Sequence, residues 1–230
     1  MQRYFVKDMN NKIEGQDAHH IKRVMRMKDG DQIIVCAHKQ CVLASIKIND
    51  KDVSYQILKT LDQIEMYDVT LIQGLPKKNK MEFVSKYATM FGASSIIFTG
   101  MQRSIAKLEN KEHKLKRLQS ISKEAAELAH RAYLPYMNME KSIKDIDFNI
   151  FDEIIVCDED EEQVALKAIT PLNKQKKYAV VIGPEGGISD QEREMFKSLN
   201  ATFVTLGTHI LSTESASLSV LSFFMHENNK

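Results

Sequence analysis

Two glycine loops in the last quarter of the chain have the residue types of a ligand-binding site. The first, at 183–187, follows an apolar run at 179–182 and holds three glycines, a proline and Glu185. Glycines let the backbone approach a ligand closely, and exposed amides at the start of a helix attract anions or dipoles. A tight turn would need only one glycine. The segment therefore predicts a binding loop, and its carboxylate favours a positively charged or polar ligand.

A second loop of the same kind lies at 204–216. It also runs from an apolar segment through a glycine, Gly207, to hydroxyl residues suited to the start of a helix. After the first loop, Ser189 and Glu192 have the spacing of a capping box. Two adjacent strand ends that both carry glycine loops predict one shared cleft.

Short apolar strands and helices alternate after residue 70. We predict strands at 69–75, 95–98, 154–157, 178–182 and 203–206, and helices at 81–91, 111–132, 161–169, 190–198 and 215–225. This alternation is typical of an α/β domain with a mostly parallel sheet covered on both faces. Ligands bind beyond the carboxyl ends of such strands. The corresponding loops follow Leu75, Phe98, Ile182 and Leu206.

The first 70 residues follow a different pattern, with short β-like runs at 32–37, 41–48 and 53–58 separated by polar breaks. Residues 38–40 have about the length of a hairpin loop, and 18–25 have helical spacing. Several strands in so short a segment predict a small barrel. The expected organisation is one domain at 1–70 and a second at 71–230.

The motifs around these loops resemble those of a known family. Ile182 to Gly187, then Leu206-Gly207, then Leu211-x-Thr213-Glu214 are similar to the SPOUT (trefoil-knot) RNA methyltransferases. Within that class the chain resembles the small-subunit (16S) ribosomal RNA uridine N3-methyltransferases. Supporting matches extend the resemblance over nearly the whole chain: Arg3 to Phe5, the run from His20 to Asp31, Lys80 to Phe83, and Arg131 with Pro135.

The resemblance implies a PUA-like RNA-binding β-barrel followed by a knotted domain that binds S-adenosyl-L-methionine (AdoMet). It implies methylation of the N3 position of a specific uridine, a homodimer, and 16S rRNA or the small ribosomal subunit as partner. The implied cofactor-binding residues are Gly183, Glu185, Gly186, Gly187, Leu206, Gly207, Leu211 and Ser212. The implied RNA-binding residues are Arg3, Arg23, Arg26, Lys77 and Lys80. The catalytic candidates are Arg103, Arg131, Glu214 and His209.

The last loop departs from the family pattern. His209 and Ser212 stand where the family has arginines, and Tyr133 replaces a third. Arginine is not readily replaced where bidentate contacts are needed, so Arg103 or Arg131 is expected to supply the charge, and His209 is a candidate base. The departures keep a second hypothesis open, a non-catalytic RNA-binding or ribosome-assembly factor. A small-molecule methyltransferase is a third hypothesis, which would leave the barrel without a role.

Charge and composition bound these hypotheses. The 230 residues carry a net charge of +1, but 71–150 holds 14 Lys/Arg against 8 Asp/Glu and 151–230 holds 7 against 13. RNA is therefore expected across the barrel and the basic middle. No apolar run approaches the roughly 18 residues of a membrane span. With no export signal, Cys36, Cys41 and Cys157 are expected to be reduced thiols of a cytoplasmic protein, and we expect no metal site.

Overall fold

The computed structural model describes residues 1–62, 65–77 and 80–228. Two compact units divide the chain between them. The first comprises Met1–Ile64 and Ala126–Leu134, and the second comprises Glu65–Ala125 and Pro135–Lys230. Each unit is organised around an apolar core of its own.

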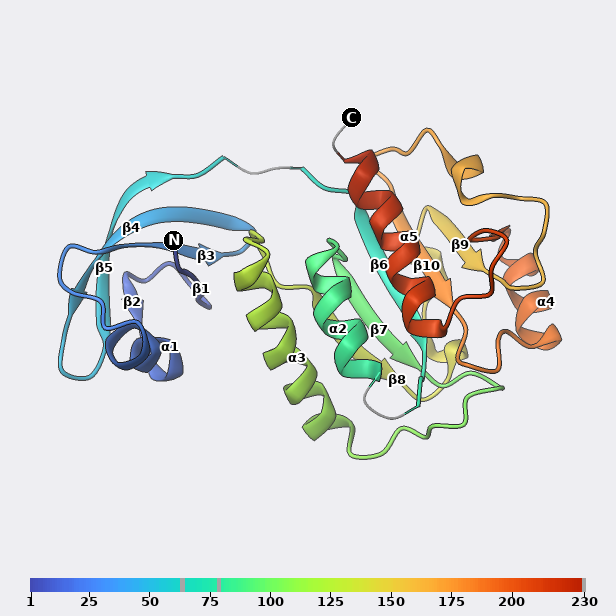
Figure 1. Cartoon of the computed structure of the whole chain (residues 1–230), viewed down its shortest axis with the longest axis horizontal. Helices are drawn as coiled ribbons and strands as arrows, with labels where there is room; N and C mark the ends of the chain where they lie inside the picture. The colour runs from blue at the N-terminus through green and yellow to red at the C-terminus, as the bar shows by residue number, and fades with distance from the viewer. Residues whose placement is uncertain (63–64, 78–79, 229–230) are drawn as a thin grey trace. The chain divides into compact units, whose positions relative to one another are not determined.

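The first unit is built on a curled five-stranded sheet (Figure 1). In spatial order the strands are β1 (Arg3–Phe5), β3 (Gln32–Ala37), β4 (Gln40–Ile48), β5 (Val53–Thr60) and β2 (Lys12–Ile13). β1 runs parallel to β3, and the other pairs are antiparallel. Helix α1 (Gly15–His19) continues into a π-helical turn at His20–Val24, which confirms the predicted helix. Ile21, in the π-helical turn, is fully buried in the core of this unit.

The hairpin between β3 and β4 corrects the prediction about cysteines. Its loop consists of His38 and Lys39, which both have positive φ, the backbone conformation that a two-residue hairpin turn requires. This turn places Cys36 directly opposite Cys41, with 4.1 Å between their Cα atoms, and the two form a disulfide. The prediction of three reduced thiols is therefore wrong for this pair, because a cysteine count carries no information about cross-strand register. Cys157 is a free, buried thiol.

The second unit confirms the predicted α/β class. Its six-stranded sheet has the order β11 (Thr202–Val204), β9 (Glu153–Cys157), β10 (Lys177–Ile182), β6 (Asp68–Gly74), β7 (Ser95–Thr99) and β8 (Tyr136–Glu140). Neighbouring strands are parallel throughout, so their carboxyl ends lie at one edge. The trefoil knot implied by the family resemblance stays a prediction.

Helices cover both faces of this sheet. Helices α2 (Lys80–Met90) and α5 (Thr213–Glu227) contact each other over one face (Figure 1), and Leu118 of α3 (Lys111–Leu128) joins the same core. Phe196 of α4 (Asp190–Ser198) is fully buried against the other face, beside Ile72 and Val181. The described part of the chain offers no helix with the length and apolar character that a membrane crossing demands.

Two predicted elements differ from the structure. Instead of a helix at 161–169 there is a 3-10 turn at Leu166–Ile169, because the Glu161 carboxylate accepts hydrogen bonds from the backbone N–H groups of Gln163 and Val164, which compete with a helix. Strand β8 was not predicted. It is only five residues long, and Met137 and Met139 are its buried positions, so its alternation rests on methionine, which is not among the residues enriched in strands.

Candidate functional site

The glycine loops meet at the carboxyl edge of the parallel sheet, as predicted. Gly74, at the end of β6, lies so close to the loop after β10 that an added Cβ would be 2.6 Å from the nitrogen of Pro184. A larger residue at this position would therefore push the two loops apart. Gly187 has φ of +71° and lies against the Glu159 carboxylate, so the loop after β9 joins the same cluster.

A buried polar network fixes the start of α5 to the sheet. The Gln73 Nε2 group donates to Thr213 Oγ1 at 2.7 Å, and Thr213 Oγ1 donates to the Gly183 carbonyl at 2.6 Å. Ser217 Oγ donates to Gln73 Oε1 at 2.9 Å. These side chains are buried, so each needs its partners. Our sequence reasoning missed Gln73, although an amide within an apolar strand was a usable signal.

The predicted capping box at the start of α4 is confirmed. Ser189 Oγ accepts from the Glu192 backbone N–H at 3.3 Å, and Glu192 Oε2 accepts from the Ser189 N–H at 3.0 Å. The other carboxylate oxygen of Glu192 accepts from the Gln102 N–H at 2.8 Å. One buried side chain therefore holds the helix start and the loop after β7 together.

Lys80 joins the two predicted binding loops through their carboxylates. Its Nζ lies 3.2 Å from Glu185 Oε1 and 2.9 Å from Glu214 Oε2, and the Lys77 backbone N–H donates to Glu185 at 2.9 Å. Burial raises the pKa of both carboxyls, but these hydrogen bonds outweigh burial and leave each pKa below its ordinary value. The hydrogen bond to Glu214 raises the pKa of Lys80. We call Lys80, Glu185 and Glu214 the carboxylate clamp; it carries a net charge of −1.

Arg103 is the predicted catalytic arginine that the fold brings to the first loop. Its Nη1 donates to the Gly186 carbonyl at 3.2 Å, and a Cβ on Gly186 would lie 3.0 Å from the Arg103 Cβ. The side chain is otherwise exposed. It can therefore stabilise negative charge that develops next to this loop.

The last loop is open around its glycine. Gly207 has φ of +127°, and an added Cβ would meet nothing within 4 Å. His209 is exposed, Ile210 is 88% exposed and Leu211 is 37% exposed. Ser212 Oγ lies 2.9 Å from Ser215 Oγ at the start of α5. The backbone here is accessible to a ligand, and the nearby clamp has an excess of negative charge, which suits a cationic ligand.

The remaining predicted arginines belong to the first unit and differ in exposure. Arg131 is only 6% exposed, its guanidinium lies 4.7 Å from the ring of Tyr133, and burial lowers its pKa. Arg3 Nη1 donates to the Arg131 carbonyl at 2.5 Å. Arg23 and Arg26 are exposed. The latter pair is accessible to a large partner, whereas Arg131 is part of the packing of its unit.

Comparison with known proteins defines the class. The RNA methyltransferase domain family matches residues 63–225, and the RNA methyltransferase PUA domain family matches 13–52. Together with the parallel sheet and its glycine loops, these matches describe an enzyme of RNA methylation. More narrowly, the chain belongs to the ribosomal RNA small subunit methyltransferase E family. It is 33% identical to the Bacillus subtilis protein of that name, over 99% of this chain and 97% of the relative.

Other relatives and solved structures agree. The Aquifex aeolicus member is 28% identical over 93% of this chain and 92% of its own length. A crystal structure described as a hypothetical protein superposes with a TM-score of 0.90 at 30% identity, over 99% of this chain and 98% of that one. The Neisseria gonorrhoeae ribosomal RNA small subunit methyltransferase E, solved with S-adenosyl methionine, shares the fold with a TM-score of 0.85 at 20% identity, over 98% and 97%.

Proposed function

We propose that this rRNA methyltransferase transfers a methyl group from AdoMet to N3 of one uridine in 16S rRNA. The observation that carries the proposal is the carboxylate clamp at the meeting point of the two glycine loops, in a chain of this family. AdoMet brings a sulfonium and an ammonium group, so a site with one uncompensated carboxylate complements its charge.

The open backbone at Gly207 suits this cofactor, as the charge of the clamp does. The relatives from Legionella pneumophila and Neisseria gonorrhoeae were solved with it bound. In this chain, backbone groups at 183–187 and 206–211 would hold it, with Gly207 as the open approach. When bound, AdoMet supplies a methyl group activated by the positive sulfur.

The protein must also prepare the nucleobase. Uracil N3 carries a proton at neutral pH and must lose it to attack a methyl carbon. We assign Arg103 to the negative charge that then develops on the uracil oxygens, and His209 to the proton, which moves from N3 to the imidazole. These roles compensate for the family arginines that His209 and Ser212 replace.

RNA is held by exposed cations of the first unit and of the basic middle. Arg23 and Arg26 would contact phosphates, which position an RNA without specifying its sequence. Lys77 of the second unit is a further candidate for a phosphate contact. A cytoplasmic homodimer with a barrel domain at 1–70 completes the proposal.

The direct test is methyl transfer to purified small subunits from cells that lack the enzyme. With tritiated AdoMet, we expect label in 16S rRNA, and mass mapping should place it on N3 of a single uridine. RNA affinity and AdoMet binding without transfer of label would contradict the proposal and favour the assembly factor. Label that reaches only small molecules would favour the third hypothesis.

Arg103 is tested in the same assay. We expect Arg103→Ala to lower kcat about a hundredfold, with partial recovery in Arg103→Lys because a charge remains without the planar fork. AdoMet affinity should change much less. Lys167→Ala, an exposed lysine of the turn at Leu166–Ile169, is the matched control. An unchanged kcat in Arg103→Ala would assign the charge stabilisation to another group.

A further inference from the structure

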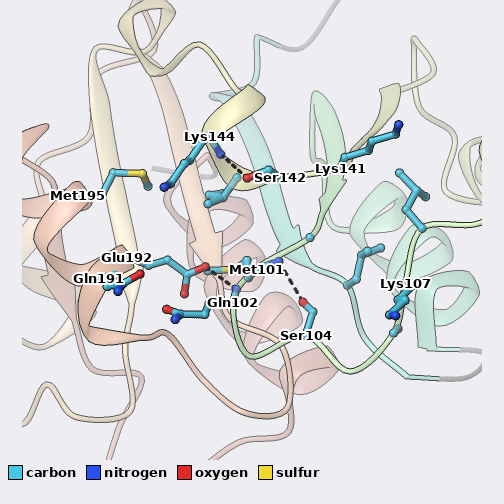
Figure 2. Close-up of a pocket in the computed structure, with 15 residues that line it drawn as sticks. Met101, Gln102, Ser104, Lys107, Lys141, Ser142, Lys144, Gln191, Glu192 and Met195 are labelled. Atoms are coloured by element: carbon cyan, nitrogen blue, oxygen red, sulfur yellow. Dashed lines mark hydrogen bonds between the residues drawn. The ribbon is translucent and has the colours of Figure 1, made fainter.

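A cavity of about 790 Å³ opens at the carboxyl edge of the parallel sheet, beside α4 (Figure 2). Four segments of the second unit line it: Leu75 directly after β6, the loop after β7, the turn after β8, and the first two turns of α4. The carboxylate clamp and the residues of both glycine loops are not among those that line it. The cavity is therefore a site in addition to the proposed cofactor cleft, and its volume lies within the range of pockets that take small ligands.

Its walls combine apolar and hydrogen-bonding groups. Met101 and Ile143 are buried side chains of the lining, and Met195 of α4 packs against the same core cluster. Figure 2 shows Met101 and Met195 among the lining side chains. Gln102 and Gln191 contribute exposed amides. An apolar wall with amides beside it can accept a nucleobase, since a base has an apolar face and donors and acceptors along its edge.

The charge of the lining is positive. Lys107, Lys141 and Lys144 line the cavity and are exposed, and within the described residues no ion pair with a carboxylate involves them. Glu192 is the one carboxylate of the lining, and both its oxygens already accept hydrogen bonds from Ser189 and Gln102. The lining therefore favours an anionic ligand, whereas the clamp favours a cationic one.

We propose that this cavity holds one unpaired nucleotide of the RNA substrate, with its base against the methionine wall and its phosphates on the three lysines. The inference rests on the proposed function. The loop at 101–104 connects the two sites, because Gln102 and Ser104 line the cavity while Arg103 bonds to the Gly186 carbonyl. A nucleotide bound here would fix the register of the strand, so that a neighbouring uridine faces Arg103.

Charge reversal at the lysines tests the proposal. We expect Lys107→Glu and Lys144→Glu each to weaken binding of a fluorescein-labelled oligouridylate about fivefold or more, and to reduce the slope of log Kd against log salt by about one. The KM for small subunits should rise in step, while AdoMet affinity stays within twofold. Lys167→Glu makes the same change in charge outside the cavity and is the matched control.

A second variant distinguishes RNA binding in the cavity from general electrostatic attraction of RNA to the lysines. Gln191→Trp fills the cavity from the first turn of α4 without changing charge, so it should weaken RNA binding with an unchanged salt slope. Circular dichroism and AdoMet affinity verify its fold.

The inference is overturned if wild type methylates RNA while all three variants bind the oligonucleotide as the control does. It is also overturned if the variants change only the oligomeric state in sedimentation, which would make this face a contact for a second copy. Failure of wild type to methylate uridine would instead reject the proposed function.

Discussion

Lys80 illustrates how one residue takes its role from its neighbours. The family resemblance implied contact with RNA phosphates, yet the Lys80 ammonium lies between Glu185 and Glu214. Both carboxylates come from loops that follow it by more than a hundred residues. The lysine neutralises part of the charge that two converging carboxylates create, and it leaves enough negative charge to attract a cation.

Removal of this ammonium should destabilise the protein in a pH-dependent way. We expect Lys80→Met to lower the free energy of unfolding by about 1 kcal/mol at neutral pH, a modest value because the three side chains are partly exposed. Each carboxyl has a pKa below its ordinary value of 4.5 in the folded state, so the stabilisation is present above that pH and is lost as pH falls through the folded pKa. Urea denaturation from pH 7 to pH 3 measures the difference.

Lys80→Arg is the conservative control, because it retains the charge. It should unfold close to wild type at neutral pH. A wild-type advantage over Lys80→Met that stays constant down to pH 3 would show that packing of the lysine stem, rather than the ion pairs, stabilises the fold.

At the scale of elements, polar contacts between β6, the loop after β10 and α5 determine where the site forms. Thr213, the first residue of α5, accepts from Gln73 and donates to Gly183. Glu192 performs a similar role for α4 and the loop after β7. Each helix start is therefore held by a hydrogen bond to a distant element, which positions the glycine loops between them.

The substitution Thr213→Val measures how much the hydrogen bonds of Thr213 with Gln73 and Gly183 stabilise the fold. Valine has the same shape but removes the short hydrogen bonds that Gln73 donates and Gly183 accepts at Thr213. Only the longer contacts of the Gln73 amide with the Gly74 and Gly183 carbonyls remain, so we expect a loss of about 1–3 kcal/mol in unfolding free energy. Thr202→Val on β11, half-buried and outside the network, should change stability by less than about 0.5 kcal/mol. In a double-mutant cycle with Gln73→Leu, additive losses would contradict a shared hydrogen bond.

In the whole molecule, the proposed cofactor-binding and RNA-binding groups come from segments of opposite net charge. The near-neutral total conceals an excess of six positive charges at 71–150 and of six negative charges at 151–230. The acidic end contains both glycine loops, while the cavity lysines and Arg103 come from the basic middle. This separation suits an enzyme with a cationic cofactor and a polyanionic substrate.

RNA affinity of the full chain should therefore depend steeply on salt, because bound counterions are released from the RNA. Arg26, exposed on the first unit, is a suitable probe. We expect Arg26→Glu to weaken oligouridylate binding about fivefold and to lower the salt slope by about one, measured by fluorescence anisotropy between about 50 and 200 mM salt. Lys51→Glu, on the turn after β4, is the control. Equal effects of both changes would indicate diffuse attraction to the unit instead of a site at Arg26.

The sequence by itself determined the features that depend on neighbouring residues. Glycine spacing in 183–187, the capping box of Ser189 and Glu192, and the alternation of strands with helices all arise from local rules. The structure confirms the capping box and, except for the predicted helix at 161–169, the alternation. The family motifs are also local, so they pointed correctly to an RNA methyltransferase.

Only the tertiary structure decided which distant groups meet. Gln73 and Thr213 are 140 residues apart yet share a hydrogen bond, Cys36 and Cys41 pair because of the hairpin register, and the lysine-lined cavity combines four separate segments. Such contacts follow from how apolar faces pack and how parallel strands align at one edge. No local spacing encodes them, because the chain that separates the partners sets their distance only after it has folded.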